Sequence, residues 1–117
     1  MVISKFVTDD GIVILRLSGK LISSTLDKLK TILDSVLADD GCRVTLNLKQ
    51  VNIMDSVAVG LLISRFKTAQ KKKGALKFCE LQPSIKKLIS LADLDKWLEI
   101  YETEEDSISS MRVEAKS

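Results

Sequence analysis

The stretch Arg43-Val-Thr-Leu-Asn-Leu48 alternates like a β-strand, and after the segment Lys49 to Met54 a helical pattern runs from Ser56 to Lys73. The apolar side chains of this pattern recur on one face, and Gly74 stands where a helix would end. The residues that share the face are Val59, Leu62, Ile63, Phe66 and Ala69. We therefore expect a loop over Lys49 to Met54, followed by the clearest helix of the protein.

The upstream sequence predicts two strands and a helix. The β-rich stretches Ile3 to Thr8 and Ile12 to Leu17 are separated by Asp9-Asp10-Gly11, which is typical of a hairpin. A helical pattern follows from Ser23 to Leu37. The strand at Arg43 is thus reached through a helical crossover, which implies parallel strand pairing.

The downstream sequence continues the alternation of strands and helices. Ala75 to Glu80 reads as a strand, Pro83 suits the first turn of a helix, Leu98 to Tyr101 is a short strand, and Glu102 to Val113 predicts a last helix. We expect Trp97 to pack against that last strand. The order β-β-α-β-α-β-α-β-α predicts an α/β fold, a mixed sheet with about four helices packed mainly on it.

Length and composition predict a single globular domain over residues 1–117 with a polar C-terminal tail. Hydrophobic residues make up 45% of the chain and the formal net charge is only +2, so nucleic acid and membrane are not expected as partners. No basic leader or long apolar run is present, which favours the reducing cytoplasm as the location.

The sequence contains few of the side-chain patterns that enzymes commonly use for catalysis. The chain has no histidine, which removes the usual general base and the commonest metal ligand. Cys42 and Cys79 lie far apart, each among strand-like residues, and we expect them to be buried apolar side chains. No catalytic residue, metal site or cofactor is therefore expected.

The junction between the third strand and the following helix carries Asp55 and Ser56. Functional groups of open α/β sheets collect where strands end and helices begin. Helix capping alone could account for either residue, so their spacing by itself favours a structural role. Ser23 and Ser24 precede the first predicted helix, where they would either cap it or join the same face.

Several short segments carry a family resemblance: Val13-Ile-Leu-Arg-Leu-Ser-Gly19, Leu46-Asn-Leu48, Met54-Asp-Ser56, Gly60-Leu-Leu62, Lys73-Gly-Ala-Leu-Lys-Phe78 and Ile85-Lys-Lys-Leu-Ile-Ser-Leu-Ala-Asp-Leu94. With them the chain resembles the STAS domain family, named for sulfate transporters and anti-sigma-factor antagonists, from about residue 3 to residue 108. It looks most like the stand-alone bacterial antagonists.

The family's signature after the third strand reads Asp-Ser-Ser-Gly-Leu-Gly, and its first serine, which a partner kinase phosphorylates, falls on Ser56. Val57 and Ala58 stand where the family commonly has serine and glycine. Ile22 stands near a position at which many relatives carry aspartate.

The resemblance implies an anti-sigma-factor antagonist that is a substrate and ligand, not an enzyme. Its unphosphorylated form would bind an anti-sigma factor that is also a serine kinase, releasing the sigma factor, and a PP2C-like phosphatase would restore that form. The expected partner-binding residues are Asp55, Ser56, Val57, Ser23 and Ser24, on a monomer that forms heterocomplexes. The alternative, kept open by Val57 and Ala58, is a constitutive STAS scaffold or accessory subunit of a regulatory or transport assembly.

Overall fold

Strands and helices alternate along the chain in the order that the sequence predicts. The computed structural model describes residues 1–116, and the side chains of residues 1–112. The strands are β1 (Val2–Val7), β2 (Val13–Leu21), β3 (Arg43–Met54), β4 (Ala75–Cys79) and β5 (Ile100–Tyr101). The helices are α1 (Asp27–Val36), α2 (Ser56–Lys71), α3 (Pro83–Leu91) and α4 (Glu104–Lys116), with single 3₁₀ turns η1 (Ser23–Thr25) and η2 (Leu94–Lys96).

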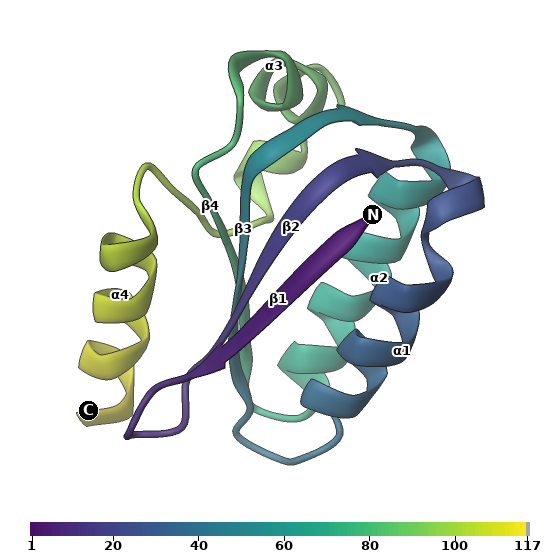
Figure 1. Ribbon diagram of the computed structural model, residues 1–117. Helices are drawn as coiled ribbons and strands as arrows, with labels where there is room; N and C mark the ends of the chain where they lie inside the picture. The colour runs from purple at the N-terminus through teal and green to yellow at the C-terminus, as the bar shows by residue number, and fades with distance from the viewer. Residues whose placement is uncertain (117) are drawn as a thin grey trace.

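The strands form one mixed sheet in the order β1-β2-β3-β4-β5. Only β1 is antiparallel to its neighbour, and the pairs from β2 to β5 are parallel. Helices α1 and α2 cover one face of the sheet and α4 covers the other, as Figure 1 shows. The expected α/β fold, a mixed sheet carrying four helices, is confirmed.

The main hydrophobic core lies between the sheet and helices α1, α2 and α3. Leu15, Leu46 and Phe78 stand in register across β2, β3 and β4 and are almost fully buried. Leucines at helical spacing, such as Leu29 and Leu33 of α1, close over them. Apolar side chains that recur about every 3.6 residues along the helices thus pack against apolar side chains that recur every two residues along the strands.

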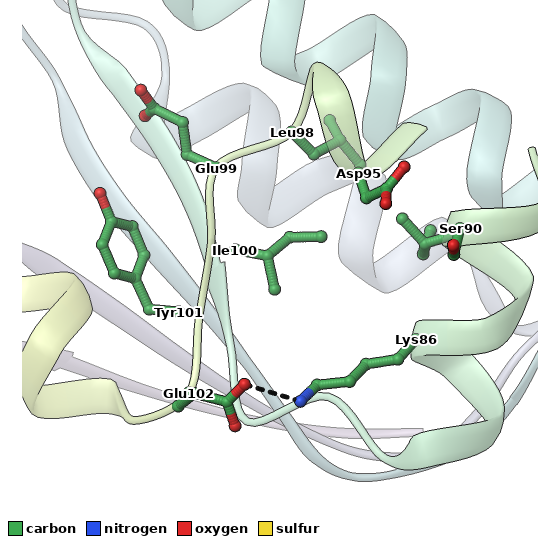
Figure 2. A pocket seen from close by; sticks show the side chains of 9 residues that line it. Lys86, Ser90, Asp95, Leu98, Glu99, Ile100, Tyr101 and Glu102 are labelled. Atoms are coloured by element: carbon green, nitrogen blue, oxygen red, sulfur yellow. Dashed lines mark hydrogen bonds and ion pairs between the residues drawn. The ribbon is translucent and has the colours of Figure 1, made fainter. Parts of the chain in front are cut away.

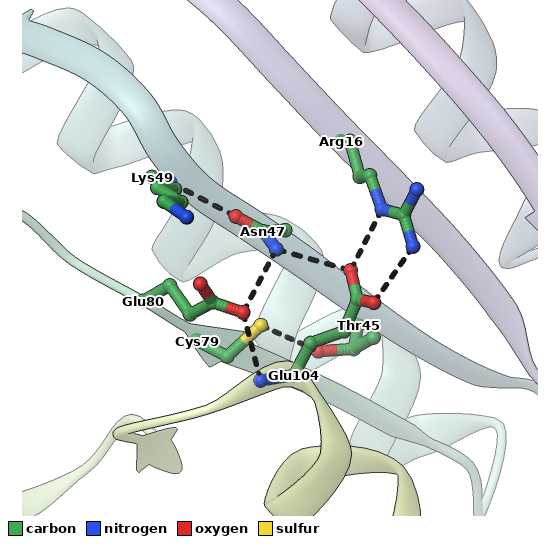
Figure 3. A network of polar contacts seen from close by, with 7 residues as sticks. All are labelled: Arg16, Thr45, Asn47, Lys49, Cys79, Glu80 and Glu104. Carbon is green, nitrogen blue, oxygen red and sulfur yellow. Dashed lines mark hydrogen bonds and ion pairs between the residues drawn. The ribbon is translucent and has the colours of Figure 1, made fainter.

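The opposite face of the sheet is polar where α4 packs on it. Thr45 and Lys77 are fully buried there, and the Thr45 hydroxyl lies 2.7 Å from the Ser107 hydroxyl of α4. Figure 3 shows how Glu104, in the first turn of α4, makes a bidentate ion pair with Arg16 of β2 and accepts from Asn47 of β3. Hydrogen bonds therefore help to position α4, beside buried apolar residues of the same face such as Ile14, which pairs in register with Thr45.

The expected loop over Lys49 to Met54 was wrong, because β3 continues to Met54 and pairs with β2 along this whole length. The register shifts between Arg16 and Ser18 and again between Gly19 and Lys20, and β3 carries the additional residue at both points. Buried Val51 and Met54 are therefore separated by two exposed residues and not by one. Because strands are predicted from alternating apolar and polar residues, this break in the alternation made the end of β3 look like a loop.

Two expectations about single side chains had opposite outcomes. Cys42 and Cys79 are free and buried, as predicted. The packing expected for Trp97 was wrong, because its side chain is 66% exposed after η2.

Candidate functional site

Asp55 is the N-cap residue of α2, directly before its first residue. Its backbone is extended, and its side-chain oxygen Oδ1 accepts a hydrogen bond of 2.9 Å from the N–H of Ala58. The other oxygen, Oδ2, accepts one of 2.8 Å from the N–H of Ser23 in η1. One carboxylate thus caps α2 and joins it to the turn that leads into α1.

The hydrogen bonds at Asp55 also set its charge. The N–H groups of Ala58 and Ser23 stabilise the ionised carboxylate, and they lower the pKa of Asp55 below its ordinary value. The Asp55 backbone N–H donates to the carbonyl of Leu21 at 3.1 Å, so the end of β2 holds the same junction. The site consequently carries a fixed negative charge at a well-anchored point.

Ser56 is the first residue of α2 and is exposed. Of the two capping candidates it is Asp55 that caps, so Ser56 is not needed for the helix start. Among the described residues, the Ser56 hydroxyl has no hydrogen-bond partner. It therefore stands in solvent at the positive end of a 16-residue helix.

Ser23 and Ser24 lie in η1, and both are exposed. Neither side chain caps α1, whose N-cap position is Leu26 and has no side-chain hydrogen bond. The hydroxyl of Thr25 instead accepts from the N–H of Ile22 and holds the turn. The structure thus places Ser23 beside Asp55 and leaves the hydroxyl groups of both serines available on the surface.

Apolar side chains flank Ser56 on the surface. Val57 is 52% exposed and Ile53, near the end of β3, is 48% exposed. Met54 is buried in the core and Val59 is partly buried, so neither extends this apolar area far. Ile53 was missed by sequence reasoning because it fell in the expected loop, and the broken alternation at the end of β3 gave no signal for it.

The exposed junction consisting of Ser23, Ser24, Ile53, Asp55, Ser56 and Val57 is called the switch surface below. In Figure 1 it lies where the end of β3 meets the start of α2, next to the turn that follows β2. It combines a free hydroxyl, one carboxylate and exposed apolar area. Such a surface can accept a modification or a protein partner.

Other features of the molecule lie away from this surface. A hollow of about 610 Å³ lies between α3 and β5, and Lys86 pairs with Glu102 at its edge at 2.9 Å. Figure 2 shows Ile100 pointing into it. Within the described residues, no three potential metal-ligating side chains cluster. No helix in the part of the chain that the structure describes is long and apolar enough to cross a lipid bilayer.

Comparison with known proteins gives consistent results. The model of the STAS domain matches residues 5–107. An anti-sigma F factor antagonist from Paenibacillus polymyxa is 30% identical over 104 residues, which cover 88% of this chain and 89% of the relative.

Solved structures with the same fold include stand-alone antagonists. An anti-sigma factor antagonist from Mycobacterium paratuberculosis is 26% identical, with a TM-score of 0.81 and 95% of each chain covered. The Bacillus cell fate determinant SpoIIAA in its phosphorylated form is 21% identical, with a TM-score of 0.70, and the match covers 93% of this chain and 98% of that one. The family match spans nearly every element from β1 to α4, and the chain therefore belongs to the STAS domain family.

Proposed function

We propose that the protein is an anti-sigma-factor antagonist whose binding is switched off by phosphorylation of Ser56. The observation that carries the proposal is the division of roles at the start of α2. Asp55 supplies the cap, so the exposed Ser56 hydroxyl is free to react. The similarity to an anti-sigma F factor antagonist supports the same role.

In its unphosphorylated form, the protein binds an anti-sigma factor that is also a serine kinase, and the sigma factor is released. The switch surface supplies the contacts: exposed Val57 and Ile53 give apolar area, while Ser23 and Ser24 give hydroxyl groups at the rim. Asp55 contributes a charge that its hydrogen bonds keep ionised. The protein is the substrate of the kinase and does no chemistry itself.

Phosphate at Ser56 has opposite effects on the free domain and on the complex. A phosphoserine carries about −1.5 to −2 charges at neutral pH. The N-terminus of α2 favours an anion at that position, so the fold tolerates the modification. A partner that closes over Val57 must bury this charge beside the Asp55 carboxylate, and repulsion and desolvation then oppose binding.

A PP2C-like phosphatase returns the protein to the binding form, and the protein acts as a monomer that forms heterocomplexes. The solved phosphorylated form of the Bacillus relative supports a modified state on this fold. Because the proposed partners regulate transcription, the proposed role belongs to the bacterial cytoplasm.

The test incubates the protein with ATP and an anti-sigma F factor that has serine kinase activity, then locates phosphate by mass spectrometry. We expect one phosphate on Ser56, none in the Ser56→Ala variant, and unchanged modification in Ser109→Ala, which removes an exposed hydroxyl of α4 outside the switch surface. Binding of the kinase should persist in Ser56→Ala and fall at least about tenfold in Ser56→Asp, which adds a charge to the interface. Phosphate placed on another serine would contradict the proposal, as would equal binding by both variants.

A constitutive scaffold is the second candidate, and one observation favours it. The half-exposed Val57 follows Ser56 directly and adds bulk where a kinase must approach. A scaffold would bind its partner equally with and without ATP and would take up no phosphate. Replacing Val57 by serine separates the two candidates, since a switch limited by bulk would then be phosphorylated faster.

A further inference from the structure

An apolar groove lies along the C-terminal half of α2, away from the switch surface. One wall is formed by Ile63 and Phe66 of α2, and the other by Leu94, Trp97 and Leu98 around η2. The hollow between the two walls has a volume of about 230 Å³. A second hollow of about 120 Å³ shares Phe66 and continues the groove toward β4.

Packing in the hydrophobic core does not account for the position of Trp97 in this groove. It is the only tryptophan of the chain, and its side chain is 66% exposed although Leu98 beside it is buried. Large aromatic side chains that line a hollow in this way often provide the anchoring contact of a protein interface. The groove therefore has the shape and the apolar content of a docking surface.

Lys67 lines the groove on the α2 side, and more lysines follow it at the end of the helix. Helix α2 contains no acidic residue, and its C-terminal end carries Lys67 and Lys71, followed by Lys72 and Lys73. Within the described residues, none of these four lysines takes part in an ion pair. An acidic partner would find cations there that no carboxylate among residues 1–112 already neutralises.

The acidic residues near the opposite wall have less influence on the groove. Asp93 pairs with Lys96 at 3.8 Å. Glu99 lines the second hollow, and its carboxylate pairs with the buried Lys77 at 3.5 Å. Asp95 lines the separate hollow beside α3, as Figure 2 shows. The net charge available to a ligand in the groove is therefore positive.

We propose that this groove docks an acidic amphipathic helix of a partner protein, with Trp97 as its apolar anchor. Apolar side chains on one face of such a helix would enter the hollow between α2 and η2, while carboxylates beside them would meet Lys67 and Lys71. A concave site favours inserted side chains over a flat lipid surface. This contact goes beyond the switch surface and does not depend on phosphorylation.

The groove and the switch surface occupy opposite ends of α2. Ser56 and Phe66 are separated by about 15 Å along the helix axis at 1.5 Å per residue. That separation exceeds the Debye length of about 8 Å at physiological ionic strength, so charge at Ser56 is largely screened at the groove. Both forms of the protein should therefore dock the acidic helix.

The test uses the fluorescence of Trp97 in the full chain, with two synthetic peptides roughly four helical turns long. Both carry leucines on one face; the other face carries glutamates in the first peptide and lysines in the second. We expect a saturable blue shift with the glutamate peptide only, weakened by salt. Affinity should fall about tenfold in Lys67→Glu/Lys71→Glu, as two attractive contacts become repulsive.

Matched variants separate this contact from general charge effects and from the switch. Lys28→Glu/Lys30→Glu makes the same charge change on α1 and should leave the affinity unchanged, as should Ser56→Asp. With a labelled peptide, anisotropy should show loss of binding in Trp97→Ala. Equal binding of both peptides, or no binding, would refute the proposal.

Two further outcomes would identify a different occupant and overturn the proposal. A blue shift of the protein alone that depends on its concentration would mean that a second copy covers the groove. A blue shift with vesicles of phosphatidylglycerol and phosphatidylcholine, without a response to the glutamate peptide, would mean that the surface binds membranes.

Discussion

Asp55 performs two structural tasks with its two carboxylate oxygens. Oδ1 caps α2 through the N–H of Ala58, and Oδ2 holds the N–H of Ser23 in the preceding crossover. A loss of this carboxylate would free both the helix start and the turn. Ser56, one residue later, can change its chemistry without affecting either contact.

We expect Asp55→Ala to lower the thermal midpoint by about 5 °C, because it removes a helix cap and a tie between two segments. Asp55→Asn keeps an oxygen that can cap but supplies only one acceptor, and should lose roughly half as much. Ser56→Ala should leave the midpoint unchanged, since its hydroxyl caps nothing. Circular dichroism melts of the three variants check this order, and a Ser56→Ala loss equal to that of Asp55→Ala would contradict the assigned roles.

The position of the candidate site could be predicted from sequence. Which of its two adjacent residues caps α2 could not. Asp55 and Ser56 are both good capping residues and are adjacent, so local spacing does not choose between them. The choice depends on the N–H of Ser23, which lies 32 residues away in sequence. Contacts of that kind arise only once the sheet and both crossovers are assembled.

Among the elements, α4 differs from the other helices in how it is held. Helices α1 to α3 pack on leucine-rich strand faces, whereas α4 meets buried Thr45, Asn47 and Lys77. The sequence predicts a last helix over Glu102 to Val113 but not the polar contacts that hold it on the sheet. Alternation along β3 marks Thr45 and Asn47 as outward-facing, and only the packing of α4 makes them buried.

A double-mutant cycle tests the polar contact between α4 and β3. Thr45→Val keeps the shape of the side chain but leaves the buried Ser107 hydroxyl without its 2.7 Å partner, which should cost about 1–3 kcal/mol of unfolding free energy. Ser107→Ala should cost a similar amount. Because the double variant removes both hydroxyl groups, it should lose clearly less than the sum, as measured by urea unfolding. Strictly additive losses would show that the two hydroxyl groups are not coupled.

The two surfaces proposed to bind partners lie at different places on the molecule. The switch surface lies at the start of α2, the apolar groove lies at the end of the same helix, and α4 closes the far face of the sheet. The basic rim at the end of α2 contrasts with the acidic first turn of α4. The topology therefore keeps the two proposed binding surfaces apart on the fold.

The pH dependence of the free energy of unfolding follows from the titratable side chains whose pKa values change on folding. Hydrogen bonds lower the pKa values of Asp10, Asp55 and Glu104 in the folded state, so their contribution is present above the unfolded pKa and is lost as pH falls through the folded one. Burial raises the pKa of Cys79 from 9.0 to about 11, so the unfolded chain ionises first and stability falls between those values. Because the chain has no histidine, we expect a flat profile between about pH 5 and 8. Urea unfolding at a series of pH values measures this profile. Cys79→Ala should reduce the loss of unfolding free energy at alkaline pH and leave the acid side unchanged. A sharp change in unfolding free energy near neutral pH would contradict the assignment.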